Sequence, residues 1–206
     1  MKHSIFLLLT VASILFLANC ASFTAGAFNA TSAKSDPAAI EEDSIHITVK
    51  ALSPQESKRL FDCNIHEHGY QPLSVSISNQ SKLDIVFTPD SIPRFVPVEQ
   101  VLEATDFNPG IRLVTWSLPW LINIAFGYPV YYGILWPIIG VIDMGNANKA
   151  NNERADFFHG IEAKSITLMP GKEFSGIVFI RYTGKKGFTL KLIHGGTPIQ
   201  IEVDPY

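Results

Sequence analysis

The feature that most constrains this chain is residues 113–142, a mid-sequence stretch without a single charged side chain. An apolar run longer than about 18 residues is normally a candidate membrane span. This run is broken repeatedly by Pro119, Pro129, Pro137, Gly127, Gly133 and Gly140. Because proline and glycine disfavour a helix interior, we do not expect one straight helix here.

Three arrangements of this stretch are open: a hairpin in lipid or in a partner's groove, a pair of helices packed on its own domain, or a single span. A single span would place the flanking β segments on opposite sides of a membrane. Packing on the domain would need more apolar surface than the rest of the chain offers. Hairpin legs at 118–126 and 130–142 would rise about 14 and 20 Å, short of the roughly 30 Å hydrocarbon core. We therefore expect a helical hairpin that enters one leaflet and returns.

The aromatic residues of the stretch fit this interpretation, because tryptophan and tyrosine favour the membrane interface. The residues expected to insert into the membrane or a partner are Trp116, Trp120, Gly127, Tyr128, Pro129, Tyr131, Tyr132, Gly133, Trp136 and Gly140.

The first residues have the pattern of a secretory signal peptide. Lys2 precedes an uninterrupted apolar segment at 5–17, so residues 1–19 are expected to be removed. The following Leu17-Ala18-Asn19-Cys20 resembles the lipobox of bacterial lipoprotein precursors, although Asn19 stands where that motif has a small residue. The resemblance covers these few positions and implies a covalent lipid, such as palmitate, on Cys20. Cleavage by an ordinary signal peptidase after Ser22 or Ala27 is the alternative.

Residues 20–44 are rich in Ala, Ser and Thr and lack a sustained period, which predicts a flexible tether. The chain carries 16 basic and 19 acidic residues, a net charge of −3, without a basic stripe. Nucleic acid is therefore not an expected partner. With Cys20 acylated, Cys63 is the remaining cysteine, so no intrachain disulfide is expected.

Two separate parts of the chain, 45–94 and 161–206, alternate apolar and polar residues with a period of two. We expect them to form the halves of one antiparallel, immunoglobulin-like β-sandwich. The strands are expected at 45–51, 73–77, 83–87, 165–169, 174–182, 188–193 and 199–203, with the second and third joined as a hairpin. In the segment at 174–182, Val178, Ile180 and Tyr182 make one face apolar, and Ile177 and Phe179 make the other face apolar, which predicts a central strand.

The sandwich is interrupted by a helical insert at 95–160 that contains the uncharged stretch. Residues 97–107 have the spacing of an amphipathic helix, and Asn108-Pro109-Gly110 is expected to end it. Residues 143–158 are polar and weakly helical. Before the insert, Ser53 and Glu56 form a capping-box pattern that predicts a short helix.

One short segment could bind a metal ion. Cys63, His66 and His68 are possible ligands of zinc or copper, and in an extended chain the two imidazoles would point the same way. The spacing matches no established metal motif, and a fourth ligand would have to come from His46, His159 or His194. The competing interpretation is a polar surface loop.

No catalytic constellation is expected. His194-Gly195-Gly196 lies between two alternating segments, which is typical of a hairpin turn, and the chain lacks a G-x-S-x-G nucleophile elbow. We therefore expect a non-catalytic lipoprotein of the bacterial cell envelope, facing the periplasm or the cell surface. Its expected partners are membrane lipid and an envelope protein, or a second copy bound through 113–142. No cofactor other than the lipid on Cys20 is expected; a periplasmic zinc- or copper-binding protein is the alternative.

Overall fold

The computed structural model describes residues 21–29, 40–42, 44–115, 117, 135–183 and 187–204. The chain divides into two compact units, each described by itself. Unit 1 consists of Met1–Phe23 and Asp106–Arg154, and unit 2 of Thr24–Thr105 and Ala155–Tyr206. In the described part of the chain, no helix combines the length and the apolar character needed to cross a membrane.

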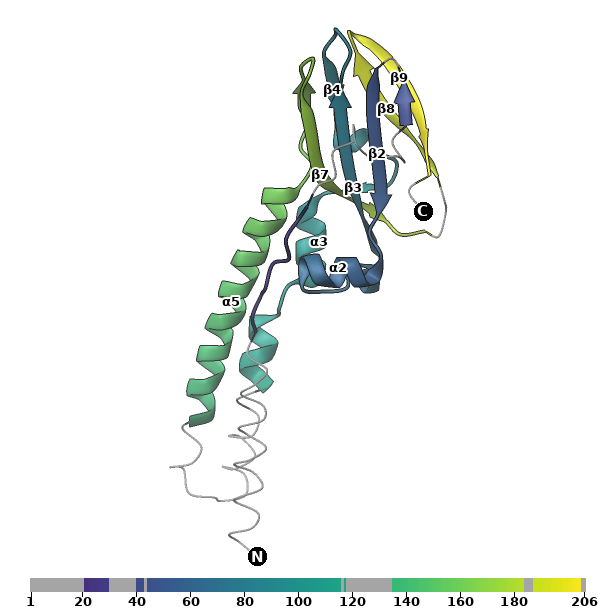
Figure 1. Cartoon of the computed structure of the whole chain (residues 1–206). Coiled ribbons are helices and arrows are strands. Elements are labelled where there is room, and N and C mark those ends of the chain that lie inside the picture. The colour runs from purple at the N-terminus through teal and green to yellow at the C-terminus, as the bar shows by residue number, and fades with distance from the viewer. Residues whose placement is uncertain are drawn as a thin grey trace, which may run out of the picture. The chain divides into compact units, whose positions relative to one another are not determined.

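Unit 2 is built on two antiparallel sheets, as the alternating segments predict (Figure 1). The first has the order β1-β2-β3-β7-β5, with strands Ile40–Glu42, Ile45–Ala51, Tyr70–Asn79, Glu173–Arg181 and Phe95–Val96. The second has the order β6-β4-β8-β9, with strands Ile166–Leu168, Ile85–Phe87, Phe188–His194 and Thr197–Val203. Both sheets combine strands from before and after the long insert.

The predicted hairpin between 73–77 and 83–87 is wrong. β3 pairs with β2 and β7, whereas β4 pairs with β6 and β8 in the other sheet. Asn79 stabilises a different path for the connection between β3 and β4. Its fully buried side-chain amide donates to Leu83 O and Leu168 O, both at 2.8 Å. Period-two alternation identifies a strand but does not identify its partner.

The two sheets share one apolar core, which includes Ile47 and Val75 of the first sheet and Phe87 and Leu192 of the second. The opposite face of the first sheet is covered by helices. Strand β7 lies between these layers: Val178 and Ile180 belong to the core between the sheets, while Ile177 and Phe179 face the helical layer. The prediction of a central strand is therefore confirmed.

The helical layer of unit 2 contains α2 (Pro54–Phe61), α3 (Val98–Thr105) and the last residues of α5 (Leu135–Ile161). Its centre is aromatic: the Phe61 ring lies 4.8 Å from that of Phe158 and 5.6 Å from that of Phe179. Short 3₁₀ turns, η2 (Ile65–His68) and η3 (Pro89–Ser91), complete the connections.

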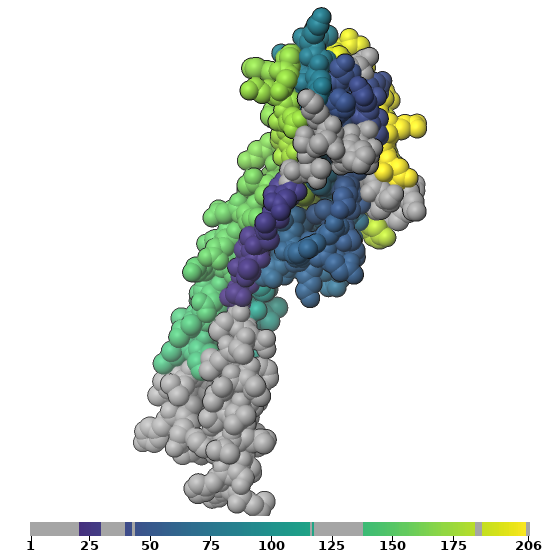
Figure 2. Space-filling model, in the orientation of Figure 1, coloured from purple at the N-terminus to yellow at the C-terminus, as the bar shows by residue number. Residues whose placement is uncertain are grey.

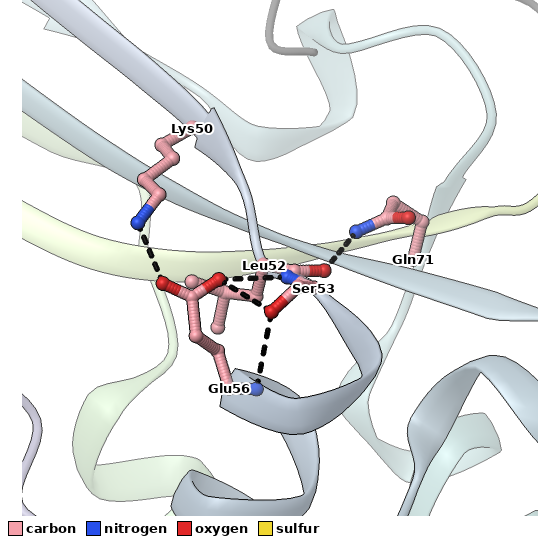
Figure 3. A network of polar contacts seen from close by, with 5 residues as sticks. All are labelled: Lys50, Leu52, Ser53, Glu56 and Gln71. Carbon is pink, nitrogen blue, oxygen red and sulfur yellow. Dashed lines mark hydrogen bonds and ion pairs between the residues drawn. The ribbon is translucent and has the colours of Figure 1, made fainter.

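Helix α2 begins with the predicted capping box (Figure 3). The Glu56 amide donates to Ser53 Oγ at 3.2 Å, and Glu56 Oε2 accepts from the Ser53 amide at 2.8 Å. Lys50 Nζ lies 2.6 Å from Glu56 Oε1. The hydrogen bonds from Lys50 and Ser53 lower the pKa of Glu56 from its ordinary 4.5 to about 2.

The insert differs from the sequence interpretation at two helix boundaries. Asn108-Pro109-Gly110 begins a helical segment, 109–115, because Asn108 Oδ1 accepts from the Ile111 amide at 3.0 Å and proline suits a first turn. Helix α5 continues without a break from the uncharged stretch through the polar residues to Ile161. Pro137 is compatible with this helix because it lies in the first turn, where amides need no intrahelical acceptor.

Candidate functional site

The site is an ion pair between the residues that flank the uncharged stretch. Arg112 immediately precedes it and Asp143 immediately follows it. One Arg112 guanidinium nitrogen lies 3.2 Å from Asp143 Oδ1 and 3.1 Å from Oδ2. The Asp143 side chain is 5% exposed and that of Arg112 is 26% exposed. The two ends of the stretch therefore lie side by side within unit 1.

Local structure explains how each partner reaches this point. Capping by Asn108 starts the helical turn that carries Arg112. Asp143 belongs to a buried stripe of α5 that repeats every three or four residues, the spacing of one helix face. Its members are Gly140, Asp143, Ala147, Ala150 and Arg154. Small residues in this stripe let the neighbouring segment approach the helix closely.

Phe107 joins the segment that precedes Arg112 to helix α5. The Asn151 side chain accepts from the Phe107 amide and donates to the Phe107 carbonyl, both at 2.9 Å. The Phe107 ring lies 5.0 Å from the Arg112 guanidinium and 4.7 Å from that of Arg154. Such cation–π contacts are worth about 0.5–2 kcal/mol, with the upper values at desolvated sites. They help to hold the buried Arg154 in place.

A third chain segment, residues 21–23, also reaches the cluster. The Ala21 amide donates to Asp143 Oδ1 at 3.4 Å, at the long end of the hydrogen-bonding range. Ala21 is 7% exposed and packs with Ala147 and Ala150. The Phe23 ring lies 5.5 Å from the Arg154 guanidinium. The Asp143 carboxylate thus accepts hydrogen bonds both from Ala21 and from Arg112, the residue before the uncharged stretch.

Arg112, Asp143, Arg154 and Asp106 form the Asp143 cluster. It has two acids and two bases, so its total charge is close to zero. Desolvation raises the pKa of the fourth member, Asp106, and the positive charge of Arg154 opposes that rise. Nothing among these side chains is an activated nucleophile. Pairing neutralises charge at the ends of an apolar segment, and a buried pair is costly to break because one ion is left uncompensated.

Exposed aliphatic side chains gather in the sequence around the same ends. Ile111 and Val114 are 64% and 65% exposed, and Ile138, Val141 and Ile142 are 50–57% exposed. Scattered exposed apolar residues are ordinary on a protein surface, but branched aliphatics concentrated in two short segments indicate a contact surface.

Most residues expected to insert lie outside the described part of the chain. These are Trp116, Trp120, Gly127, Tyr128, Pro129, Tyr131, Tyr132 and Gly133. Trp136 and Gly140 lie on α5, where Gly140 is buried. Cys20, the expected lipidation site, also precedes the described residues. The Arg112–Asp143 pair was missed by sequence reasoning; opposite charges at the two ends of the stretch were the available signal.

The candidate metal ligands do not form a cluster. His66 and His68 lie on the 3₁₀ turn η2 and not in an extended chain. The ring nitrogens of His66 lie 2.9 Å from Gln71 Oε1 and 3.2 Å from Asn64 Oδ1. The Cys63 side chain is half-buried. Among the described residues, no three His, Cys, Asp or Glu side chains are grouped closely enough to hold a metal ion.

One serine–histidine contact was also missed. Ser81 Oγ lies 2.9 Å from Nε2 of His194, the residue that precedes the predicted turn at Gly195-Gly196. The same hydroxyl donates to Asn79 Oδ1 at 2.7 Å and accepts from the Leu83 amide at 3.2 Å. A hydroxyl saturated in this way organises the 79–84 loop, and we assign it that structural role.

Comparison with models of protein families, with curated proteins and with solved structures finds no match for this chain.

Proposed function

We propose that this protein is a non-catalytic lipoprotein of the bacterial cell envelope whose uncharged stretch, residues 113–142, enters one leaflet of the membrane as a hairpin. The Arg112–Asp143 ion pair is the observation that carries this proposal. A segment crossing the bilayer once separates its ends by about 30 Å. Here the charged groups at the ends are 3.1 Å apart, which supports a chain that returns to its starting side.

The exposed aliphatic residues next to these ends support lipid as the partner. Ile111, Val114, Ile138, Val141 and Ile142 extend the apolar character of the stretch onto the described helices. Each buried aliphatic side chain contributes about 1.5–3 kcal/mol on transfer from water. Several such side chains together could hold the segment in the hydrocarbon layer.

We further propose that unit 2 is an immunoglobulin-like sandwich that presents the hairpin. This proposal is supported by the strand orders β2-β3-β7 and β6-β4-β8-β9, which are compatible with the A-B-E and C′-C-F-G sheets of such domains. In this correspondence the insert lies in the connection between strands C and C′. A covalent lipid on Cys20 would supply durable anchoring alongside the insert, since one chain alone binds membranes reversibly. No contact among the described residues favours the metal-binding alternative.

Vesicle flotation tests the proposal. The mature chain should float with phospholipid vesicles, and a variant with 113–142 replaced by a Gly-Ser linker and Cys20→Ala should remain in the soluble fraction. Topology is tested with Lys82→Cys and Lys172→Cys, both at exposed positions of unit 2, in a Cys63→Ala background. An impermeant thiol reagent should label both from the same side. Opposite labelling would establish a true span and refute the hairpin.

A further inference from the structure

Residues 21–29 are part of the folded structure, although the sequence favours a flexible tether. Within unit 2, the Thr24 amide donates to Asp62 Oδ2 at 3.1 Å and the Gly26 amide donates to Leu60 O at 3.0 Å. Figure 2 shows the unit 2 part of this purple segment, residues 24–29, lying against the blue surface that includes α2. A Cβ on Gly26 would come within 2.3 Å of Arg59 O, so glycine is required for this approach.

Within unit 1, the beginning of the same segment is bound to the Asp143 cluster. Ala21 contributes its amide hydrogen to Asp143 and its methyl group to the alanine pair of α5. Phe23 contributes its ring to Arg154. Cleavage after Ser22 would remove the Ala21 contacts, and cleavage after Ala27 would remove those of Phe23 as well. The folded structure therefore favours a cleavage site that leaves Ala21 in the mature chain, and cleavage between Asn19 and Cys20, which makes Cys20 the first residue, satisfies this.

Asp143 consequently receives three chain segments at one point. Its carboxylate accepts from the residue that follows Cys20 and pairs with Arg112 at the start of the stretch, while Asp143 itself stands at the end of that stretch. Consecutive Cα atoms are about 3.8 Å apart. The residue that would carry the lipid is therefore covalently adjacent to the point where 113–142 begins and ends.

We propose that the Asp143 carboxylate couples the lipid anchor to the apolar insert: by holding Ala21 beside both ends of 113–142, it directs the acyl chains on Cys20 and the insert into the same leaflet. This inference rests on the proposed function. Its physical basis is effective concentration, because a lipid that is fixed at the base of the insert keeps the insert at the bilayer surface without a long tether.

The tryptophans provide a specific measurement. All three in the chain, Trp116, Trp120 and Trp136, lie within the stretch, so intrinsic fluorescence reports on the insert alone. The lipidated wild type is reconstituted into phosphatidylcholine vesicles whose acyl chains carry bromine, which quenches nearby tryptophan. We expect strong quenching of the wild type and about a twofold or greater loss of quenching in Asp143→Ala. Glu153→Ala, also on α5 but 49% exposed, is the matched control and should retain wild-type quenching.

A second variant leaves the cluster intact. A short Gly-Ser linker inserted between Cys20 and Ala21 separates the lipid from the cluster while every contact of Ala21 remains. We expect this linker variant to stay membrane-bound through its lipid and to lose quenching in the same direction as Asp143→Ala. Should Asp143→Ala lose the cooperative unfolding of unit 1, the linker variant alone decides.

The outcomes separate the two proposals. Wild-type quenching in the linker variant and in a folded Asp143→Ala protein would overturn the coupling and leave the membrane hairpin standing. Absence of fatty-acid labelling at Cys20 in the wild type, or absence of tryptophan quenching, would overturn the proposed function and the coupling with it.

Discussion

Arg112 and Asp143 are 31 residues apart in the sequence, yet their side chains form an ion pair with both carboxylate oxygens within 3.2 Å of one guanidinium nitrogen. The 30 residues between them carry no charge. The nearest charged groups on either side of the stretch thus neutralise each other, and the two ends of the stretch lie side by side.

This pair should be strongly coupled in stability measurements. Because the Asp143 side chain is 5% exposed, removing Arg112 leaves a buried carboxylate without its main cation. Hydrogen bonds to charged groups contribute about 1.5–3 kcal/mol, and we expect a coupling free energy of this size between Arg112→Ala and Asp143→Ala in a double-mutant cycle. Chemical denaturation in detergent micelles measures it. Lys149 and Glu153, an exposed pair on the same helix, should give no more than about 0.5 kcal/mol, and equal values for the two pairs would contradict the assignment.

The capping box of α2 predicts a defined pH dependence. The pKa of Glu56 is lowered from 4.5 to about 2 in the folded protein, so its ionised form is bound more tightly by the folded state. Its contribution should be fully present above about pH 4.5 and should be lost as the pH falls toward 2. We expect Glu56→Gln to destabilise unit 2 at neutral pH and to approach the wild type below pH 3, as measured by urea denaturation across this range.

Ser53→Ala is the companion to this experiment. It removes the acceptor of the Glu56 amide and one donor to the Glu56 carboxylate, and N-cap losses cost about 1 kcal/mol. Because Lys50 still contacts Glu56 at 2.6 Å, we expect a smaller pH-dependent component than for Glu56→Gln. An identical pH profile in the two variants would show that neither Lys50 nor the Ser53 amide contributes to the shift.

The sequence predicts elements of this protein better than it predicts their contacts. The strand at Ile45–Ala51 and the helices beginning after Ser53 and at Val98 follow from local periodicity and capping. The pairing of β4 with β6 and β8 depends on Asn79, whose side chain bonds a carbonyl 89 residues away. The Arg112–Asp143 ion pair was not predicted for the same reason. The charges at the borders of the apolar run are visible in the sequence, but the distance between them depends on how both helices are placed.

The order found in residues 21–29 is a further example. The alanine, serine and threonine residues of this segment show no helical or strand periodicity. Its contacts are mostly made by backbone amides, which every sequence has and which a sequence pattern therefore cannot predict. Phe23 and Phe28 are the large apolar side chains of the segment, and both are packed against buried residues.

Gly26→Ala should therefore be destabilising. A methyl group at this position would meet Arg59 O at 2.3 Å and Leu60 Cα at 2.9 Å, and these are backbone atoms that cannot move aside as a flexible side chain would. We expect a loss above about 1 kcal/mol, the lower range for overpacking. The matched control is Gly145→Ala on α5, where the added methyl meets nothing within 4 Å and should stabilise by up to about 1 kcal/mol through helix propensity. Thermal unfolding compares the two, and wild-type stability of Gly26→Ala would mean that the segment is not held as described.

The short distance between the two ends of residues 113–142 leads to a final prediction about unit 2. Both sheets, and the core between them, are made by residues outside 113–142, and the ends of the stretch are already adjacent at Arg112 and Asp143. A short Gly-Ser linker can therefore replace the stretch without stretching the chain. We expect the shortened protein to be more soluble and to keep a single cooperative unfolding transition with an unchanged midpoint. Leu190→Ala, at a fully buried position of β8, provides the contrast, since it should lower stability by about 2–5 kcal/mol in either background. If removal of the stretch instead abolished cooperative unfolding, residues 113–142 would be part of the domain's own core, and packing on the protein rather than insertion into lipid would be the correct interpretation.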